Sequence, residues 1–246
     1  NKFWHRVMFP IIDMYSMLFG CGGWWMGDNM PKCLNAAETK IFEISRHLYG
    51  FHRDRSSRKS DLLRSEGYMD VIALHRAGFT NAVASLGTAL TAGHARLISQ
   101  RGYREVFLTY DSDDAGTKAA VRAVPILKEA GISAKVIRMD PYKDPDEFIQ
   151  KLGSEAFEKR IGEARNGFMF SLEVMERDYD LNSPEGKTGF MQGVARRLTE
   201  FDEEIERTNY IDAAARAYHV DAGDLRKLVR RVAIEAGQGK PINRPK

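Results

Sequence analysis

The sequence predicts an α/β protein built around a parallel β-sheet with helices on both of its faces. Three observations support this prediction. Apolar runs alternate with amphipathic helical runs over residues 62–150, a glycine-rich basic segment precedes them, and a segment with helical spacing follows them. Strands that alternate with helices form parallel sheets joined by right-handed crossovers. The chain has 246 residues, of which 43% are hydrophobic, so it can bury a core against such a sheet.

Residues 1–60 are expected to form a small basic α+β subdomain. Strand-like runs at residues 7–12 and 17–27 stand among glycines, and nine lysines and arginines outnumber five acidic residues. The polar, basic run at 53–60 is typical of an exposed connector. We expect this subdomain to be partial, because the chain opens without methionine on a strand-like run, as a piece of a longer protein does.

Residues 61–150 are expected to form the parallel sheet. Each of the first three apolar runs is short and is followed by a run with an apolar residue at every third or fourth position, and a fourth apolar run ends the pattern. The strands are predicted at residues 62–66, 82–86, 105–110 and 133–139, and the helices at residues 68–78, 92–102 and 115–131.

Residues 151–237 are expected to form a helical subdomain, and residues 238–246 a flexible tail. The long segment has helical spacing throughout, and Ser183 followed by Pro184 is typical of the start of a helix. The last residues are rich in glycine, proline and basic side chains, as linkers and tails are. The helices are predicted at residues 168–181, 183–202, 204–220 and 222–237.

Carboxylates gather at the predicted ends of three strands. Because the ends of parallel strands share one edge of a sheet, we expect these side chains to converge. So many carboxylates together must bind either protons or cations, and oxygen ligands favour Mg²⁺ or Mn²⁺. The acids in this position are Glu66, Asp111, Asp113, Asp144 and Asp146.

A structural turn is the alternative interpretation of each acid taken singly. An Asp-x-Asp pair after a strand, or Asp-Pro-Asp in a loop, often serves as a turn and a helix cap. We assign that capping role to Asp114, before a helix expected to begin at Ala115. The three sites together, all at strand ends, favour a metal-binding cluster over three unrelated turns.

Composition and spacing exclude several other classes of protein. No apolar run is long enough to cross a membrane, and the first residues lack the pattern of a signal peptide. Cys21 and Cys33 have no partners at zinc-ligand spacing and form no disulfide framework. We therefore expect a cytoplasmic protein with free thiols. The net charge of +3 is only weak support for a polyanionic partner.

Three motifs of the central segment resemble the Toprim domain of bacterial DnaG-type primases. They are EGYMDVIALHRAGFTNAVASLGTALT at 66–91, YDSDDAGTKAAVRA at 110–123 and KDPDEF at 143–148. The flanking segments resemble the same family. RVMFPI at 6–11 is similar to the basic subdomain before Toprim, and RDYDLNSPEGKTGF at 177–190 is similar to the helical subdomain after it. The resemblance covers nearly the whole chain.

This resemblance implies a DNA primase core that makes short RNA primers on single-stranded DNA from ribonucleoside triphosphates. It implies that the five strand-end acids bind two or more Mg²⁺ or Mn²⁺ ions for two-metal nucleotidyl transfer. Glu66, Asp111 and Asp113 would then be catalytic.

The resemblance also implies a basic ridge beside the acids, a replicative helicase as partner, and companion domains. Arg6, Lys32 and Asn35 match ridge positions that bind nucleotide or DNA. We expect the zinc ribbon and the helicase-binding domain of the family to be absent from this chain.

Several residues depart from the family's usual pattern, among them Cys33, Ala36 and Ala37 in the loop around Lys32. Trp24 stands where arginine is usual and Ile44 where lysine is usual, so nucleotide affinity is expected to be altered. Arg64 and Ser65 stand where the first Toprim strand is usually apolar, so this strand is expected to be strained or more exposed.

Two other functions remain as alternatives. A Toprim nuclease or topoisomerase would share the acids but not the flanking motifs. A nucleotide- or DNA-binding fragment with weak or no polymerase activity would account for Trp24 and Ile44.

Overall fold

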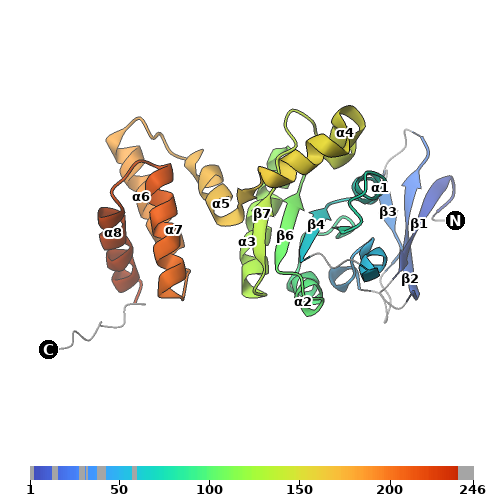
Figure 1. The fold of residues 1–246 in the computed structure, drawn as a ribbon, viewed down its shortest axis with the longest axis horizontal. Helices are drawn as coiled ribbons and strands as arrows, with labels where there is room; N and C mark the ends of the chain where they lie inside the picture. The colour runs from blue at the N-terminus through green and yellow to red at the C-terminus, as the bar shows by residue number, and fades with distance from the viewer. Residues whose placement is uncertain are drawn as a thin grey trace. The chain divides into compact units, whose positions relative to one another are not determined.

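The computed structural model describes residues 3–12, 16–27, 31, 33–37, 43–56 and 60–237. The chain divides into two compact units, Asn1–Phe170 and Ser171–Lys246. The first unit contains two β-sheets, and the described part of the second is helical (Figure 1).

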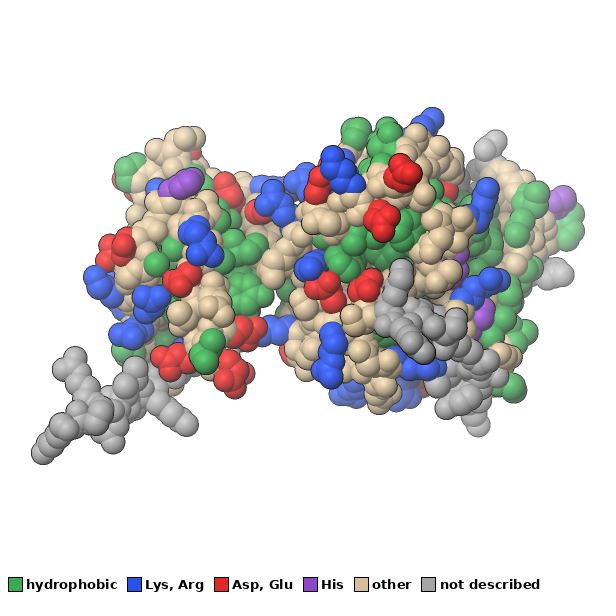
Figure 2. All heavy atoms as spheres, viewed as in Figure 1, with side chains coloured by type: hydrophobic (Ala, Val, Ile, Leu, Met, Phe, Trp, Pro, Cys, Tyr) green, Lys and Arg blue, Asp and Glu red, His purple; other side chains and the backbone are tan. Residues whose placement is uncertain are grey.

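The N-terminal sheet consists of three antiparallel strands in the order β1-β2-β3. Its inner face packs on the central part of the unit through a cluster that includes Phe9, Ile11, Tyr68 and Leu86. Figure 2 shows apolar side chains at the surface of this region, where Met8 and Leu18 are exposed. The elements of this segment are β1 (Arg6–Ile12), β2 (Leu18–Trp25), β3 (Cys33–Asn35) and the 3₁₀ helices η1 (Ile44–Arg46) and η2 (Phe51–Ser56).

The central sheet has the order β5-β4-β6-β7-β8 and confirms the predicted α/β class. The first four of these strands are parallel to one another, and only β8 runs antiparallel, against β7. β4 and β6 pair in register up to Ser65 and Thr109, so both end at the same edge. The strands are β4 (Asp61–Ser65), β5 (Ala82–Ala84), β6 (Glu105–Thr109), β7 (Ser133–Val136) and β8 (Arg165–Asn166).

Helices cover both faces of this sheet. On one face α1 and α4 pack on it through a core that joins Leu63 and Phe107 of the strands to Leu74, Phe148 and Phe157 of the helices. Helices α2 and α3 contact each other on the opposite face (Figure 1). The four helices are α1 (Tyr68–Arg76), α2 (Ala92–Gln100), α3 (Asp114–Glu129) and α4 (Pro145–Gly162).

A buried histidine joins η1 to the start of α2. The Nδ1 atom of His94 accepts a hydrogen bond from the Thr91 N–H at 3.3 Å, so its Nε2–H donates to the Ile44 carbonyl at 2.8 Å. Burial lowers the pKa of His94 to about 4, which keeps the ring neutral. This contact is structural and fixes the backbone of residue 44.

The strand β4 is buried at every residue except the first. Arg64 is 1% exposed and Ser65 is 0% exposed, and the strand pairs with β5 and β6 without a break in register. The expectation that these polar residues make the strand more exposed is therefore wrong. Ser65 is accommodated because its hydroxyl bonds to the hydroxyl of Thr109 at 2.6 Å.

The C-terminal segment is helical with one exception. The two-residue strand β8 lies within the segment that the sequence predicts to be helical throughout, because it pairs with the edge strand β7. Ser183 caps α6 as predicted, accepting from the Gly186 N–H at 2.9 Å. The helices are α5 (Gly167–Glu176), α6 (Pro184–Leu198), α7 (Glu204–Ala217) and α8 (Ala222–Glu235).

The predicted subdomain limits stay predictions. The proposed limit between residues 150 and 151 falls inside α4, whereas the two compact units divide after Phe170. The predicted tail, residues 238–246, lies outside the described residues. No helix in the described part of the chain is both long and apolar enough to span a membrane.

Candidate active site at the carboxyl edge of the central sheet

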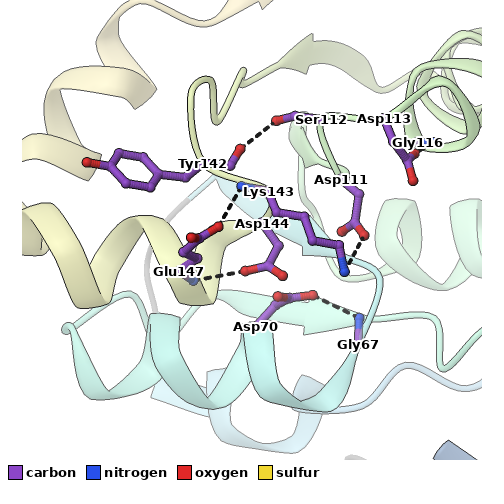
Figure 3. Close-up of polar contacts among 10 residues, drawn as sticks. All are labelled: Gly67, Asp70, Asp111, Ser112, Asp113, Gly116, Tyr142, Lys143, Asp144 and Glu147. Atoms are coloured by element: carbon purple, nitrogen blue, oxygen red, sulfur yellow. Dashed lines mark hydrogen bonds and ion pairs between the residues drawn. The ribbon is translucent and has the colours of Figure 1, made fainter. Parts of the chain in front are cut away.

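The predicted acids lie where parallel strands end. Glu66 follows β4 directly, and Asp111 and Asp113 follow β6. Asp144 and Asp146 begin α4, after the loop that leaves β7. All five therefore belong to the carboxyl edge of the sheet, and Figure 3 shows Asp111, Asp113 and Asp144 in this region.

The turn after β6 brings α3 close against the backbone of Asp111. Asp113 is the N-cap of α3, and its Oδ1 accepts from the Gly116 N–H at 2.7 Å. A Cβ on Gly116 would lie 2.1 Å from the Asp111 carbonyl oxygen, so only glycine fits there. The assignment of the cap to Asp114 is wrong. The helix begins at Asp114, one residue earlier than expected, and the cap therefore falls on Asp113.

The loop before α4 is hydrogen-bonded to this turn. The Ser112 N–H donates to the Lys143 carbonyl and the Ser112 hydroxyl to the Tyr142 carbonyl, both at 2.9 Å. Asp144 caps α4 by accepting from the Glu147 N–H at 2.9 Å (Figure 3). Two sequence-distant loops thus form one rigid edge, and each capping aspartate uses one oxygen for the cap and keeps the other.

Glu66 and Asp111 interact directly across the ends of β4 and β6. Burial raises the pKa of Glu66, and the neighbouring charge of Asp111 raises it further. The charge of Arg64 and a hydrogen bond from the Asp111 N–H act in the opposite direction. Burial also raises the pKa of Asp111, against the effect of Lys143, whose Nζ lies 3.7 Å from its Oδ2. Both carboxyls are therefore poised to exchange a proton or to accept a cation.

The sequence reasoning missed a sixth acid, Asp70. It lies in the first turn of α1, is 7% exposed, and accepts from the Gly67 N–H at 3.1 Å. Burial and the charges of Asp144, Asp111 and Asp146 raise its pKa to about 7. The available signal was its place four residues after Glu66, which puts it on the first helical turn behind the strand end.

The acids offer only oxygen ligands. Among the described residues, no three His, Cys, Asp or Glu side chains lie close enough to hold a metal ion by themselves. Mg²⁺ often needs only one or two carboxylates, since waters and substrate phosphates complete its octahedron. The donor set thus fits Mg²⁺ or Mn²⁺ shared with a phosphate ligand, and it does not fit a closed structural metal site.

The predicted ridge residues take part in the fold. Arg6 donates to the Pro31 carbonyl at 2.8 Å and stacks over Trp25 at 5.2 Å. Asn35 accepts from the Tyr68 hydroxyl and donates to the Leu86 carbonyl, both at 2.7 Å. Lys32 lies outside the described residues. Whether these residues bind nucleotide or DNA stays a prediction.

The two apolar residues that stand where the family usually has a basic residue pack against the same cluster. Trp24 and Ile44 are partly buried and pack against the cluster that includes Tyr68 and Leu86. Apolar contacts thus occupy the positions where the resemblance implies cations, next to the loop after β5.

Comparisons with known proteins agree with this fold. A family of Toprim-like domains matches residues 65–149, so the central sheet and its acidic edge form a Toprim-like domain. The N-terminal domain of the DNA primase catalytic core matches residues 1–55. The chain belongs to the bacterial DnaG-type primase family.

Three relatives illustrate the similarity. The chain is 37% identical to a DNA primase of Clostridium acetobutylicum over 86% of this chain and 35% of that protein. A solved DnaG catalytic core superposes with a TM-score of 0.78 at 33% identity, covering 92% of this chain and 74% of that one. A DnaG catalytic domain bound to ssDNA superposes with a TM-score of 0.79, also at 33% identity, over 91% of this chain and 72% of that one.

One expectation needs correction. The DnaB-helicase binding domain of primase matches residues 168–222, which cover most of the described helices of the second unit. The expectation that this chain lacks a helicase-binding domain is therefore wrong, because the family's helicase-binding domain matches helices within the chain. The chain spans little more than a third of the C. acetobutylicum relative.

Proposed function

We propose that this chain is the RNA-polymerase core of a DNA primase and joins ribonucleotides on a single-stranded DNA template. The convergence of carboxylates from three loops on one sheet edge carries the proposal. Glu66 and Asp111 contact each other there, and the charges of Asp111 and Asp144 both raise the pKa of Asp70. Membership of the primase family supports it, and the flanking matches favour primase over a Toprim nuclease or topoisomerase.

The residues of the edge have distinct roles in this proposal. The five predicted acids would hold two or more Mg²⁺ or Mn²⁺ ions, which would supply Lewis-acid stabilisation of the attacked phosphate and of the departing pyrophosphate. Glu66 assists removal of the proton from the primer 3′-hydroxyl, in keeping with its raised pKa. The capping bonds of Asp113 and Asp144 keep their carboxylates in place before substrate arrives.

The proposed partners are single-stranded DNA, ribonucleoside triphosphates and a replicative helicase. A relative's catalytic domain has been solved with ssDNA, which supports the first. The match over residues 168–222 supports a helicase contact by the helical unit. Arg6, Lys32 and Asn35 are proposed to contribute to nucleotide or DNA binding, and the protein is proposed to act in the cytoplasm.

Primer synthesis by this chain tests the proposal. The chain is incubated with single-stranded DNA, ribonucleotides and Mg²⁺ or Mn²⁺, and both RNA products and template integrity are measured. Asp111→Asn keeps the shape but removes the charge, so RNA synthesis is expected to fall by a factor of about 100 or more. The matched control is Asp114→Asn, an exposed residue three positions away, which should retain activity.

Two outcomes would contradict the proposal. Metal-dependent cutting of the template without RNA synthesis would assign the site to a nuclease. Nucleotide binding with neither RNA synthesis nor cutting would assign the chain to a binding module, as Trp24 and Ile44 in the apolar cluster would allow.

A further inference from the structure

Arg64 is a fully buried arginine in β4, the strand that carries Glu66 at its end. It is 1% exposed and is the largest side chain buried to that extent among the described residues. Its Nη2 donates to the Ser85 hydroxyl and to the Thr88 carbonyl, the latter at 3.3 Å. Its guanidinium also lies over the ring of Tyr110, 4.3 Å from the centroid.

These contacts place the guanidinium at the carboxyl edge of the sheet. Ser85 directly follows β5, and Tyr110 directly follows β6 and precedes Asp111. Glu66 directly follows β4 itself. Arg64 therefore touches the loop after β5 and the end of β6, and it lies two residues before the acid at the end of β4.

The positive charge of Arg64 has no close counter-ion. Its Nε and Nη1 are buried without a hydrogen-bond partner in the described part of the chain. No carboxylate among the described residues forms an ion pair with it; its partners are a hydroxyl, a carbonyl and an aromatic ring. An unpaired buried guanidinium is costly unless charges nearby offset it. The charges available are those of the acidic edge, and Glu66 interacts electrostatically with Arg64.

We propose that Arg64 is a built-in counter-charge of the acidic edge, a positioning residue that holds three strand ends together and offsets part of the repulsion among the carboxylates. The inference rests on the metal site proposed above. A fixed cation in this position keeps the carboxylates assembled when no divalent ion is bound. The same charge also repels a divalent ion, so the wild-type edge binds such ions more weakly than its number of acids suggests.

Metal affinity separates this role from a purely structural one. Mn²⁺ binding to the full chain is measured by electron paramagnetic resonance, without nucleotide or DNA. Arg64→Met and Arg64→Gln both remove the charge, and the glutamine keeps a polar group at this buried position. Both variants are expected to bind Mn²⁺ about three- to tenfold more tightly, the order of magnitude for removing one screened charge near a divalent ion. Arg64→Lys keeps the charge and should bind as the wild type does.

Two controls accompany this measurement. Arg104→Met makes the same change just before β6, at the opposite edge of the sheet, and should leave Mn²⁺ affinity unchanged. Asp111→Asn should weaken Mn²⁺ binding. If the wild type itself binds no Mn²⁺, the proposed metal site fails. If the wild type binds and the neutral Arg64 variants bind equally well, only the role of Arg64 fails.

Thermal unfolding gives a second readout. Added Mg²⁺ should raise the Tm of the neutral Arg64 variants more than that of the wild type, because their carboxylates depend more on the ion. A Tm lowered equally with and without Mg²⁺ would overturn the proposal, as would Arg64→Lys shifting Mn²⁺ affinity as methionine does. Failure of both neutral variants to fold even with Mg²⁺ would also overturn it, since Arg64 would then serve the fold alone.

Discussion

The acidic edge and the N-terminal sheet use their polar side chains in opposite ways. At the edge, Asp113 and Asp144 each accept one backbone N–H and keep a second oxygen for another partner. In the N-terminal sheet, Asn35 uses both its oxygen and its nitrogen on Tyr68 and Leu86. Both regions belong to the same compact unit, and the sequence predicts metal binding at the edge and nucleotide or DNA binding in the N-terminal segment.

The difference follows from what each region needs for folding. Carboxylates at helix starts are anchored by backbone N–H groups, so they stay in place whether or not a ligand is bound. The N-terminal sheet is joined to the central sheet through Asn35 and the apolar cluster around Tyr68. Changes at the edge should therefore alter chemistry and metal binding, and changes in the N-terminal sheet should mainly alter stability.

The largest effect is expected from Gly116→Ala. The new Cβ would clash with the Asp111 carbonyl, so Asp111 must move, and primer synthesis should fall by a factor of about 100 or more. Stability should fall by about 1–3 kcal/mol. Gly162→Ala, at a helical glycine with open space around it, is the control and should be neutral in both assays. Full activity in Gly116→Ala would show that the position of Asp111 does not matter.

The next effect is a pH-dependent change in stability caused by Asp70. The pKa of Asp70 is about 7 in the folded state and 3.8 in the unfolded state. The protonated carboxyl therefore favours the folded state at low pH, and this contribution to the free energy of unfolding is lost as the pH rises towards 7. Without metal, Asp70→Asn should therefore be more stable than the wild type at pH 8, by up to about 4 kcal/mol.

Urea unfolding in the presence of a chelator at pH 4 and pH 8 measures this difference. The difference in free energy of unfolding between Asp70→Asn and the wild type should be smaller at pH 4, where the wild-type carboxyl is largely protonated in the folded state. Equal advantages at both pH values would contradict the assignment. Asp114→Asn, at an exposed site, controls for a general effect of removing an acid.

A smaller effect is expected in the N-terminal sheet. Asn35→Ala should lower the free energy of unfolding by about 1–3 kcal/mol, because the Tyr68 hydroxyl and the Leu86 carbonyl lose their partner. Tyr68→Phe should cost about 1 kcal/mol, and the double variant should be less than additive. Weaker nucleotide binding in Asn35→Ala with unchanged stability would instead favour the ligand-binding role that the sequence predicts.

The smallest effect is expected from Lys143→Met. The lysine side chain is 67% exposed and lies 3.7 Å from the Asp111 carboxylate, so its ion pair is screened by solvent. Stability should change by less than about 1 kcal/mol and Mn²⁺ affinity should rise by less than about threefold. If Lys143→Met raised the Mn²⁺ affinity more than Arg64→Met does, the exposed Lys143, and not the buried Arg64, would be the main counter-charge.

The sequence predicted the strands of the central sheet well because its local signals are strong. The predicted short apolar runs correspond to β4, β5, β6 and β7, and the predicted amphipathic runs between them correspond to α1, α2 and α3. It missed β8, since a two-residue strand has no periodicity and forms only because β7 offers an edge. It also placed the cap of α3 one residue too late, because adjacent aspartates are equally good caps and the close approach of Gly116 to Asp111 decides between them.

The sequence by itself determined the α/β class, the family resemblance and the strand-end positions of the five predicted acids, because periodicity and motifs are local properties. The tertiary structure decided which side chains have partners. It added Asp70 to the edge, buried Arg64 beside it, and used Asn35 to join β3 to α1 and to the loop after β5. Burial, charge and hydrogen bonding depend on residues that meet only after folding, and no local pattern records them.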